Sequence, residues 1–369
     1  MKRERDYTLD IIRIFATFSV ISVHFFLNNG FYSENVIGRR MYAMIIMRNF
    51  FMICVPLFLL LTGYLMGTKK LEKKYFLGIR KTLCIYLLAS IACILYKKYA
   101  EITDYDLKHA FFAILDFTGA SYSWYIEMYI GLFLLIPFIN LIFQNINQKQ
   151  RKLLIIVMTF LTVLPTFTNI YNFDVEHWWQ TPALDNNYQK ILPSYWGPLW
   201  PFTFYFIGYY LKEHPLRLHW TPAFLLAVLI TMATGTFNFY RSHGSAFVYG
   251  PWQNWNGLLN VILTTLIFHC LLQFKCVNHM PDAPKRVLKI VSDLTLGAYL
   301  TSYIFDQIFY KILNNKISSV PNKLEYYFCI VPIIFVCSIL LSFLLNMVYY
   351  IIQWTAEQRK RGFTHLHKK

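Results

Sequence analysis

Long apolar stretches separated by short polar segments dominate this chain. A stretch of about 20 apolar residues is long enough for an α-helix to cross the hydrocarbon core of a membrane. Ten such stretches are predicted, at about residues 8–29, 42–66, 82–99, 123–144, 153–171, 196–211, 221–239, 257–274, 290–312 and 327–353. The segment 101–120 is more polar, so we expect a surface or re-entrant helix there. The pattern predicts an all-α membrane protein with about ten transmembrane helices.

The composition excludes an ordinary soluble domain. Hydrophobic residues make up 56% of the 369 positions and aromatic residues 19%, whereas only 15% are charged. The mean hydropathy of +0.39 agrees with this. We therefore expect residues 1–356 to form a single transmembrane domain, followed by a basic, disordered cytoplasmic tail at residues 357–369.

The distribution of Lys and Arg indicates how the chain crosses the membrane. If the N-terminus is cytoplasmic, ten crossings place most of the 35 Lys and Arg residues in inner segments, for example at 69–81, 149–152 and 359–361. The positive-inside rule expects this asymmetry when both termini are cytoplasmic. Topology and anionic membrane lipid thus explain the net charge of +16, and we expect no nucleic-acid partner.

The first predicted span carries an arginine and a histidine at membrane depth. Arg13 and His24 are separated by about three helical turns plus roughly 20°, so both leave one face of the helix, about 16 Å apart. Asp10, Thr17 and Asn28 share this face. Charged groups at this depth normally face a wet cavity, so we expect both to open into one chamber. Alternatively, Arg13 snorkels to the cytoplasmic surface and His24 only forms an interhelical hydrogen bond.

Further polar side chains fall in the outer part of the predicted membrane region. Arg48, Glu127 and Asp306 reach depths similar to that of His24 if successive spans alternate in direction. The two carboxylates are suited to orienting a histidine or handling protons, and Arg48 is suited to gripping an acceptor. Ser302 precedes Asp306 by one helical turn, so the two lie on a second polar stripe.

The sequence contains no pattern typical of a metal site or a tightly bound cofactor. The seven cysteines show neither paired spacing nor metal-binding spacing. No Gly-rich phosphate loop or serine nucleophile motif is present. We therefore predict neither a metal nor a resident cofactor, and the sequence predicts no oligomeric state.

Several short motifs resemble the acyltransferase 3 family of membrane-bound O-acyltransferases. The first span is similar to that family's Asp-x-x-Arg segment followed after ten residues by a histidine, here Asp10, Arg13 and His24. The other similar segments are Val55–Leu65, Trp124–Tyr125 with Tyr129 and Pro137, Phe206–Tyr210 and Gly297–Leu300. Each motif is short, but their order along the predicted spans is specific, and the resemblance covers about residues 7–305.

The resemblance implies an O-acetyltransferase of the bacterial cytoplasmic membrane. Such an enzyme moves an acetyl or other acyl group from cytosolic acyl-CoA to a hydroxyl of an extracytoplasmic or lipid-linked carbohydrate. Arg13 would bind a phosphate or polarise the thioester, and His24 would act as general base or as a covalent acyl relay. Glu127 and Asp306 would orient His24.

The resemblance also suggests which other residues contact the two substrates. Arg80 and Lys81, in the basic loop, would contribute to donor binding, although charge in this loop also serves orientation alone. The residues expected to contact the acceptor are Arg48, Trp124, Tyr129, Tyr299 and Ser302. Two positions depart from the family pattern: Leu83 stands where members often have a second arginine, and Ser302 stands where many have a histidine.

Two other functional classes remain open from the residues alone. Intramembrane Arg, His, Glu and Asp also equip a proton-coupled exporter of sugars or small metabolites. A membrane sensor or assembly partner without chemistry is a further alternative. An exporter would move solute without consuming CoA, whereas an acyltransferase releases CoA when an acceptor hydroxyl is supplied.

Overall fold

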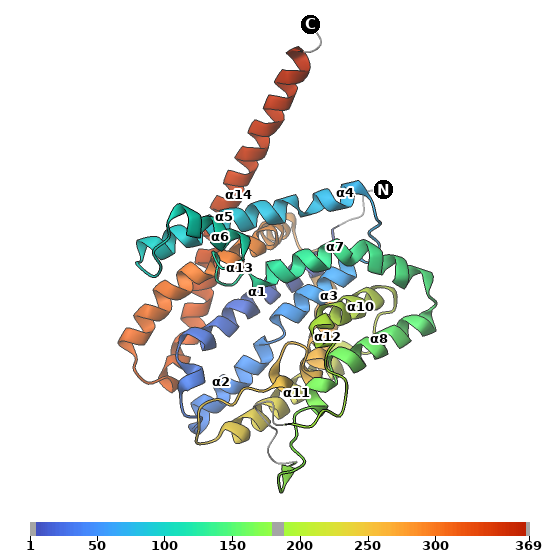
Figure 1. The fold of residues 1–369 in the computed structure, drawn as a ribbon, viewed down its shortest axis with the longest axis vertical. Helices are drawn as coiled ribbons and strands as arrows, with labels where there is room; N and C mark the ends of the chain where they lie inside the picture. Colours follow the sequence, from blue (N-terminus) through green and yellow to red (C-terminus); the bar gives the residue numbers. More distant parts are fainter. Residues whose placement is uncertain (1–4, 179–187, 367–369) are drawn as a thin grey trace.

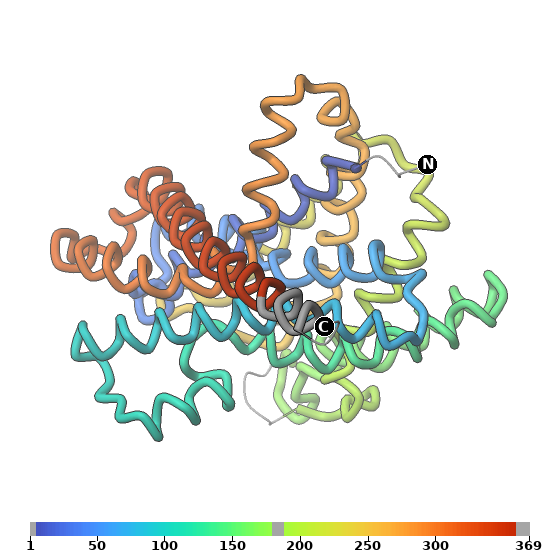
Figure 2. Tube along the Cα trace, turned by 90° about the horizontal axis from the view of Figure 1, so that it is seen from above, coloured from blue at the N-terminus to red at the C-terminus, as the bar shows by residue number. Residues whose placement is uncertain are grey.

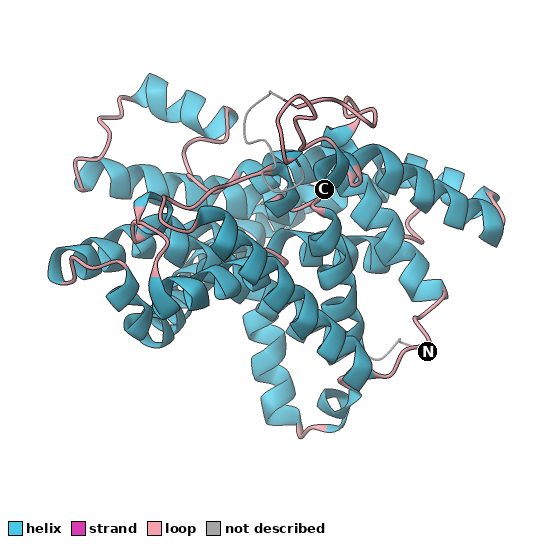
Figure 3. Cartoon of the chain, turned by 90° about the horizontal axis from the view of Figure 1, so that it is seen from below, coloured by secondary structure: helices cyan, strands magenta, loops and turns pink. Residues whose placement is uncertain are grey.

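The chain forms an all-helical bundle. The computed structural model describes residues 5–178 and 188–366, and in these ranges helices are joined by loops with no β-strand, only two isolated bridges (Figure 3). The fold class predicted from the hydropathy pattern is confirmed. The α-helices are α1 Tyr7–Asn28, α2 Gly38–Phe51, α3 Cys54–Met66, α4 Lys73–Phe76, α5 Arg80–Tyr99, α6 Leu107–Leu115, α7 Trp124–Asn145, α8 Gln148–Thr162, α9 Pro165–Thr168, α10 Trp200–Glu213, α11 Trp220–Ser242, α12 Leu258–Leu272, α13 Asp282–Lys316 and α14 Tyr327–Leu366.

Short 3₁₀ helices connect several of these elements. They are η1 Phe31–Ser33, η2 Leu77–Ile79, η4 Gly197–Leu199, η5 Pro251–Gln253, η6 Lys275–His279 and η7 Pro321–Tyr326. The second predicted span is not one continuous helix, because α2 and α3 are separated by a break at Met52 and Ile53. Irregular backbone at membrane depth is tolerated where protein or a cavity surrounds it, and both residues are buried.

Eight helical segments in the described ranges are long and apolar enough to cross a membrane. The other two predicted spans correspond to α10, which has 14 residues, and α13, which has 35. Most residues of α10 are buried, and the buried residues of α13 lie in its central part, from Ser292 to Leu313. The chain is therefore a multi-pass membrane protein, while the count of ten and the cytoplasmic position of both termini stay predictions.

Helix α1 lies within the bundle and contacts α2, α3, α12, α13 and α14 (Figure 1). This position explains why its buried residues include polar as well as apolar side chains. Asp6 caps the helix by accepting from the Thr8 amide at 3.1 Å, and it also accepts from Lys275 at 2.7 Å. Burial raises the pKa of Asp6, but hydrogen bonds, first that from Lys275, outweigh it and lower the pKa to about 2.

Helices α3 and α10 pack very closely because a glycine of each helix lies against the backbone of the other helix. A Cβ at Gly63 would collide with the backbone of Tyr205, and one at Gly208 would collide with the backbone of Leu60. Gly208 lies in the Phe206–Tyr210 motif. That motif therefore has a packing role, since it allows α10 to lie against the helix that supplies part of the cavity described below.

The C-terminal part of the chain is a helical hairpin with a long second helix. Helix α13 and helix α14 form a hairpin joined by η7, and α14 continues to Leu366, projecting beyond the bundle (Figures 1 and 2). The basic cytoplasmic tail expected from residue 357 stays a prediction. In the segment 101–120, α6 is a short helix with exposed apolar side chains such as Phe111 and Phe112, in agreement with the predicted surface or re-entrant helix.

Candidate functional site

His24 meets Asp306 across the interface between α1 and α13. The Nδ1 atom of His24 lies 3.1 Å from Asp306 Oδ2, although the angle falls outside that of a well-aligned hydrogen bond. Asp306 is fully buried and His24 is 8% exposed, so solvent screens this contact little. A carboxylate against one ring nitrogen fixes the imidazole orientation and leaves the other nitrogen, Nε2, for a substrate.

Tyr122 completes this arrangement from the segment that precedes α7. Its ring centroid lies 3.8 Å from that of His24, with 34° between the planes. Its hydroxyl donates to Asp306 Oδ2 at 2.9 Å and accepts from Asn28 Nδ2 at 3.2 Å. Tyr122 thus holds the carboxylate and covers the histidine at the same time.

Arg13 belongs to a separate polar network nearer the start of α1. It donates to Ser292 Oγ at 2.8 Å and lies 3.5 Å from Asp10 Oδ1. Arg5 donates to both carboxylate oxygens of Asp10 at 2.7 Å. Because this bidentate pair already balances the charge of Asp10, Arg13 retains hydrogen-bonding capacity for an anionic or polar ligand.

Arg13 lines a cavity of about 270 Å³ between α1, α3, α5, α7 and α13. The cavity walls are mainly apolar, with hydroxyl groups from threonine and tyrosine side chains. A mainly apolar cavity of this kind, with a guanidinium in its wall, suits a thin chain that carries a carbonyl group. The lining side chains with a guanidinium or hydroxyl group include Arg13, Thr62, Thr82, Tyr125, Tyr129 and Tyr299.

A second cavity, of about 320 Å³, lies beside Asp306. Its lining includes Asn28, Gln307, Lys311 and Asn314, so it is the more polar of the two around this site. Hydrogen-bonding side chains of this type can bind several hydroxyl groups at once.

Tyr122 links a residue that lines one cavity to a residue that lines the other. Tyr299 lines the Arg13 cavity and donates its hydroxyl to the backbone oxygen of Tyr122, whose own hydroxyl bonds Asp306 in the lining of the second cavity. His24 is in the lining of neither cavity. The expectation that Arg13 and His24 open into one chamber is therefore not met in this conformation, because the Tyr122 ring covers the histidine.

A family model described as an acyltransferase domain matches residues 6–347. The chain belongs to the acyltransferase 3 family. The protein is therefore a membrane acyltransferase. The family match favours this class of protein over a proton-coupled exporter. No curated protein and no solved structure gives a significant match.

All but one of the segments that resemble acyltransferase 3 signatures line the Arg13 cavity, the exception being Phe206–Tyr210. Val55, Phe58 and Thr62 line it from α3, and Tyr125 and Tyr129 line it from α7. Tyr299, in the Gly297–Leu300 segment of α13, closes it near Tyr122. Motifs that are far apart in the sequence thus form one wall.

Not every side chain predicted for this acyltransferase site reaches it. Glu127 is exposed on α7, whereas Tyr125 and Tyr129 face the cavity, so we withdraw Glu127 as a group that orients His24. Ser302 is fully buried and donates to the Tyr299 carbonyl at 2.9 Å within its own helix. Trp124 stacks on Trp255 with centroids 4.5 Å apart and does not line the Arg13 cavity.

The basic residues predicted to bind the donor lie at the start of α5. Arg80 is exposed, and Lys81 lies 5.6 Å from the Tyr350 ring centroid. Thr82, the next residue, lines the Arg13 cavity, so both cations lie close to one of its ends. Arg48 is in neither cavity and is described separately below.

Sequence reasoning missed Tyr122. It lies outside every predicted span, and its contacts depend on how the 101–123 segment returns to the bundle. The only available signal was its position two residues before the Trp124–Tyr125 motif.

Proposed function

We propose that this acyltransferase moves an acetyl group from cytosolic acetyl-CoA to a hydroxyl of an extracytoplasmic or lipid-linked carbohydrate, in the cytoplasmic membrane of a bacterium. The observation that carries the proposal is the His24–Asp306 contact: Asp306 lines the more polar cavity, and Tyr122 links it to Tyr299 in the mainly apolar one. Such a position allows one histidine to meet a donor from one side and an acceptor from the other.

The Arg13 cavity is suited to bind the acyl donor, acetyl-CoA. CoA is polyanionic, and Arg80 and Lys81 beside the entrance at Thr82 can pair with its phosphates. The bulky nucleotide would stay outside while the thin pantetheine arm enters the cavity. Arg13 would then donate to the thioester carbonyl or to a polar group of the arm.

The chemistry needs one base and one acid, and His24 can serve as both. The acceptor hydroxyl oxygen attacks the thioester carbon as His24 Nε2 takes its proton, and collapse of the tetrahedral species breaks the carbon–sulfur bond. The proton then passes from His24 to the departing CoA sulfur. Asp306 acts through His24, because it lies against Nδ1 and stabilises the imidazolium, so it is a positioning residue.

The lining of the second cavity is suited to bind a carbohydrate acceptor. Asn28, Gln307, Lys311 and Asn314 offer donors and acceptors close to Asp306 and hence to His24. A sugar hydroxyl entering from this side would reach Nε2 once the Tyr122 ring moves off His24.

The direct test uses purified protein with carbon-13-labelled acetyl-CoA and glycans from a bacterial surface. Our proposal predicts that free CoA appears only when an acceptor is supplied, and that the label is found on a sugar hydroxyl by mass spectrometry. Arg13→Gln is expected to raise KM for acetyl-CoA by roughly tenfold or more, the usual effect of losing a charge-assisted hydrogen bond. Solute movement without CoA consumption would instead support an exporter.

A further inference from the structure

Arg48, at the end of α2, is a buried cation remote from the two cavities described above. It is 1% exposed, and its guanidinium lies 5.3 Å from the Phe247 ring centroid and 5.2 Å from that of Tyr249. No Asp or Glu of the described ranges lies within ion-pair distance of it. A buried charge is costly unless it is paired, so this arrangement requires a reason.

The hydrogen bonds of Arg48 leave most of its donors available. Nε donates to the Tyr32 hydroxyl at 3.1 Å, and Nη1 donates to Asn49 Oδ1 at 3.3 Å. A guanidinium has five N–H groups in a planar fork, which matches carboxylate or phosphate oxygens. The aromatic rings around it hold the fork in place without neutralising its charge.

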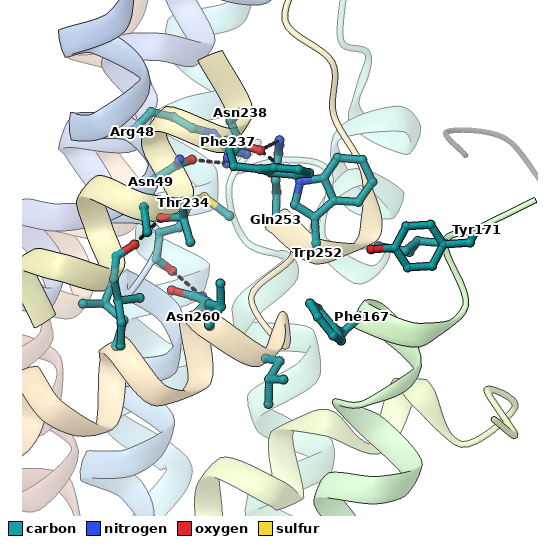
Figure 4. Close-up of a pocket in the computed structure, with 17 residues that line it drawn as sticks. Arg48, Asn49, Phe167, Tyr171, Thr234, Phe237, Asn238, Trp252, Gln253 and Asn260 are labelled. Atoms are coloured by element: carbon teal, nitrogen blue, oxygen red, sulfur yellow. Dashed lines mark hydrogen bonds between the residues drawn. The ribbon is translucent and has the colours of Figure 1, made fainter. Parts of the chain in front are cut away.

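Arg48 lines a cavity of about 300 Å³ between α2, α11, α12 and η5 (Figure 4). Three buried amide atoms at this cavity have no hydrogen-bond partner among the described groups: Asn49 Nδ2, Gln253 Oε1 and Asn260 Oδ1. Asn49 is 9% and Gln253 6% exposed, so these are enclosed polar groups. One is a donor beside the cation and two are acceptors.

Three other amide atoms, Asn238 Oδ1, Gln253 Nε2 and Asn260 Nδ2, form hydrogen bonds within the protein. These bonds fix the positions of the Gln253 and Asn260 oxygens, which have no partner among the described residues. Asn238 Oδ1 accepts from Trp252 Nε1 at 2.9 Å and from Gln253 Nε2 at 2.7 Å. Asn260 Nδ2 donates to the Met52 carbonyl, at the break between α2 and α3, at 3.3 Å. Figure 4 also places the rings of Phe167, Tyr171 and Phe237 around the cavity, with Trp252 beside Asn238.

We propose that this cavity binds an acidic saccharide unit, a sugar carrying a carboxylate or phosphate. The anionic oxygens would accept from Arg48 and Asn49 Nδ2, while sugar hydroxyls would donate to Gln253 Oε1 and Asn260 Oδ1. An aromatic ring such as that of Trp252 would pack on the apolar face of the sugar. A neutral sugar would leave the Arg48 charge unpaired, so the cavity selects for an anion.

The location of the cavity fits a subsite for the acceptor glycan. Arg48 bonds Tyr32 in η1, the turn that follows the helix bearing His24. A glycan chain of several units could therefore place one unit here and a more distant unit at the cavity beside Asp306. This inference rests on the proposed function only in identifying the saccharide as part of the acceptor.

Binding can be measured without acetyl-CoA, so its outcome is independent of whether acetyl transfer is observed. The full-length protein in phosphatidylcholine nanodiscs is titrated with D-glucuronate and with D-glucose, using saturation-transfer NMR. We expect saturable glucuronate binding and at least tenfold weaker binding of glucose. Equal affinity for the two sugars would overturn the proposal.

Two variants locate the site. Arg48→Gln is expected to weaken glucuronate binding at least tenfold, whereas Arg39→Gln, which removes an exposed charge from the same helix, leaves it unchanged. If Arg48→Gln does not fold, Asn49→Leu replaces it and is expected to weaken binding severalfold. Glucuronate binding that survives the folded variant overturns the proposal. So does retention of phosphatidylglycerol through Arg48 with no glucuronate bound, because the cavity would then be a lipid site.

Discussion

The Nδ1 atom of His24 lies 3.1 Å from Asp306 Oδ2, although 282 residues separate them in the sequence. Helix α1 supplies the base, α13 supplies the carboxylate, and Tyr122 from the returning 101–123 segment contacts both. The membrane-buried histidine is thereby oriented by a partner that is itself fixed. This relationship leads to the first two predictions.

Replacing Asp306 by asparagine keeps the side-chain volume but removes the charge that stabilises an imidazolium. We expect Asp306→Asn to lower kcat by about 100-fold or more with little change in KM for acetyl-CoA, since Arg13 and its cavity are untouched. Steady-state CoA release measures both constants. Asp282→Asn, an exposed carboxylate at the start of the same helix, is the matched control. An unchanged kcat in folded Asp306→Asn would remove this residue from the mechanism.

Tyr122 is expected to keep the two cavities apart. Tyr122→Ala removes the ring that covers His24 and the hydroxyl that bonds Asp306. Water should then reach the donor, so we expect acceptor-independent CoA release to rise severalfold while transfer to the acceptor falls. Tyr122→Phe retains the ring and is expected to lose transfer activity without gaining hydrolysis. If both variants hydrolyse acetyl-CoA no faster than wild type, Tyr122 is not a barrier.

The close packing of α3 on α10 gives a prediction about stability. Gly208→Ala forces a methyl group against the Leu60 backbone, so we expect a loss of roughly 1–3 kcal/mol and a lower Tm in detergent. Gly131→Ala is the control, because Gly131 is a helical glycine with open space around its Cβ position. Equal Tm values for the two variants would contradict the packing role assigned to the Phe206–Tyr210 segment.

Acidification gives a prediction from Asp6, which caps α1 just outside the membrane region. Its folded pKa of about 2 lies below the ordinary aspartate pKa of 3.8, so the carboxylate stabilises the fold above about pH 4. That contribution, roughly 1 kcal/mol after solvent screening, is lost as the pH falls from about 4 to 2. Wild type should therefore lose more stability than Asp6→Asn between pH 5 and pH 3 in thermal unfolding. Asp104→Asn, at an exposed loop position, should behave as wild type.

Much of the fold could be predicted from the sequence because membrane spans are local features. Apolar runs located most of the helices, and helical periodicity placed Arg13 and His24 on one polar face. The approach of Asp306 to His24 followed from two polar stripes at similar depth, without any distance being predicted.

What could not be predicted depends on contacts between distant segments. Glu127 was assigned to the site by depth alone, but the face of α7 that meets the bundle is set by tertiary packing and carries Tyr125 and Tyr129 instead. Tyr122 lies outside the spans, so periodicity gives no information about it. The position of the Tyr122 ring over His24 also depends on tertiary contacts, so the sequence could not predict it.

The most direct test of the central claim is acceptor-dependent CoA release by His24→Ala, compared with His279→Ala, which alters an exposed histidine in η6. Both proteins are first shown to be folded by size-exclusion profile and Tm. Our account predicts that His24→Ala loses at least about 100-fold in kcat while His279→Ala retains wild-type activity. Acetylation by folded His24→Ala at a rate within a few fold of wild type would contradict it.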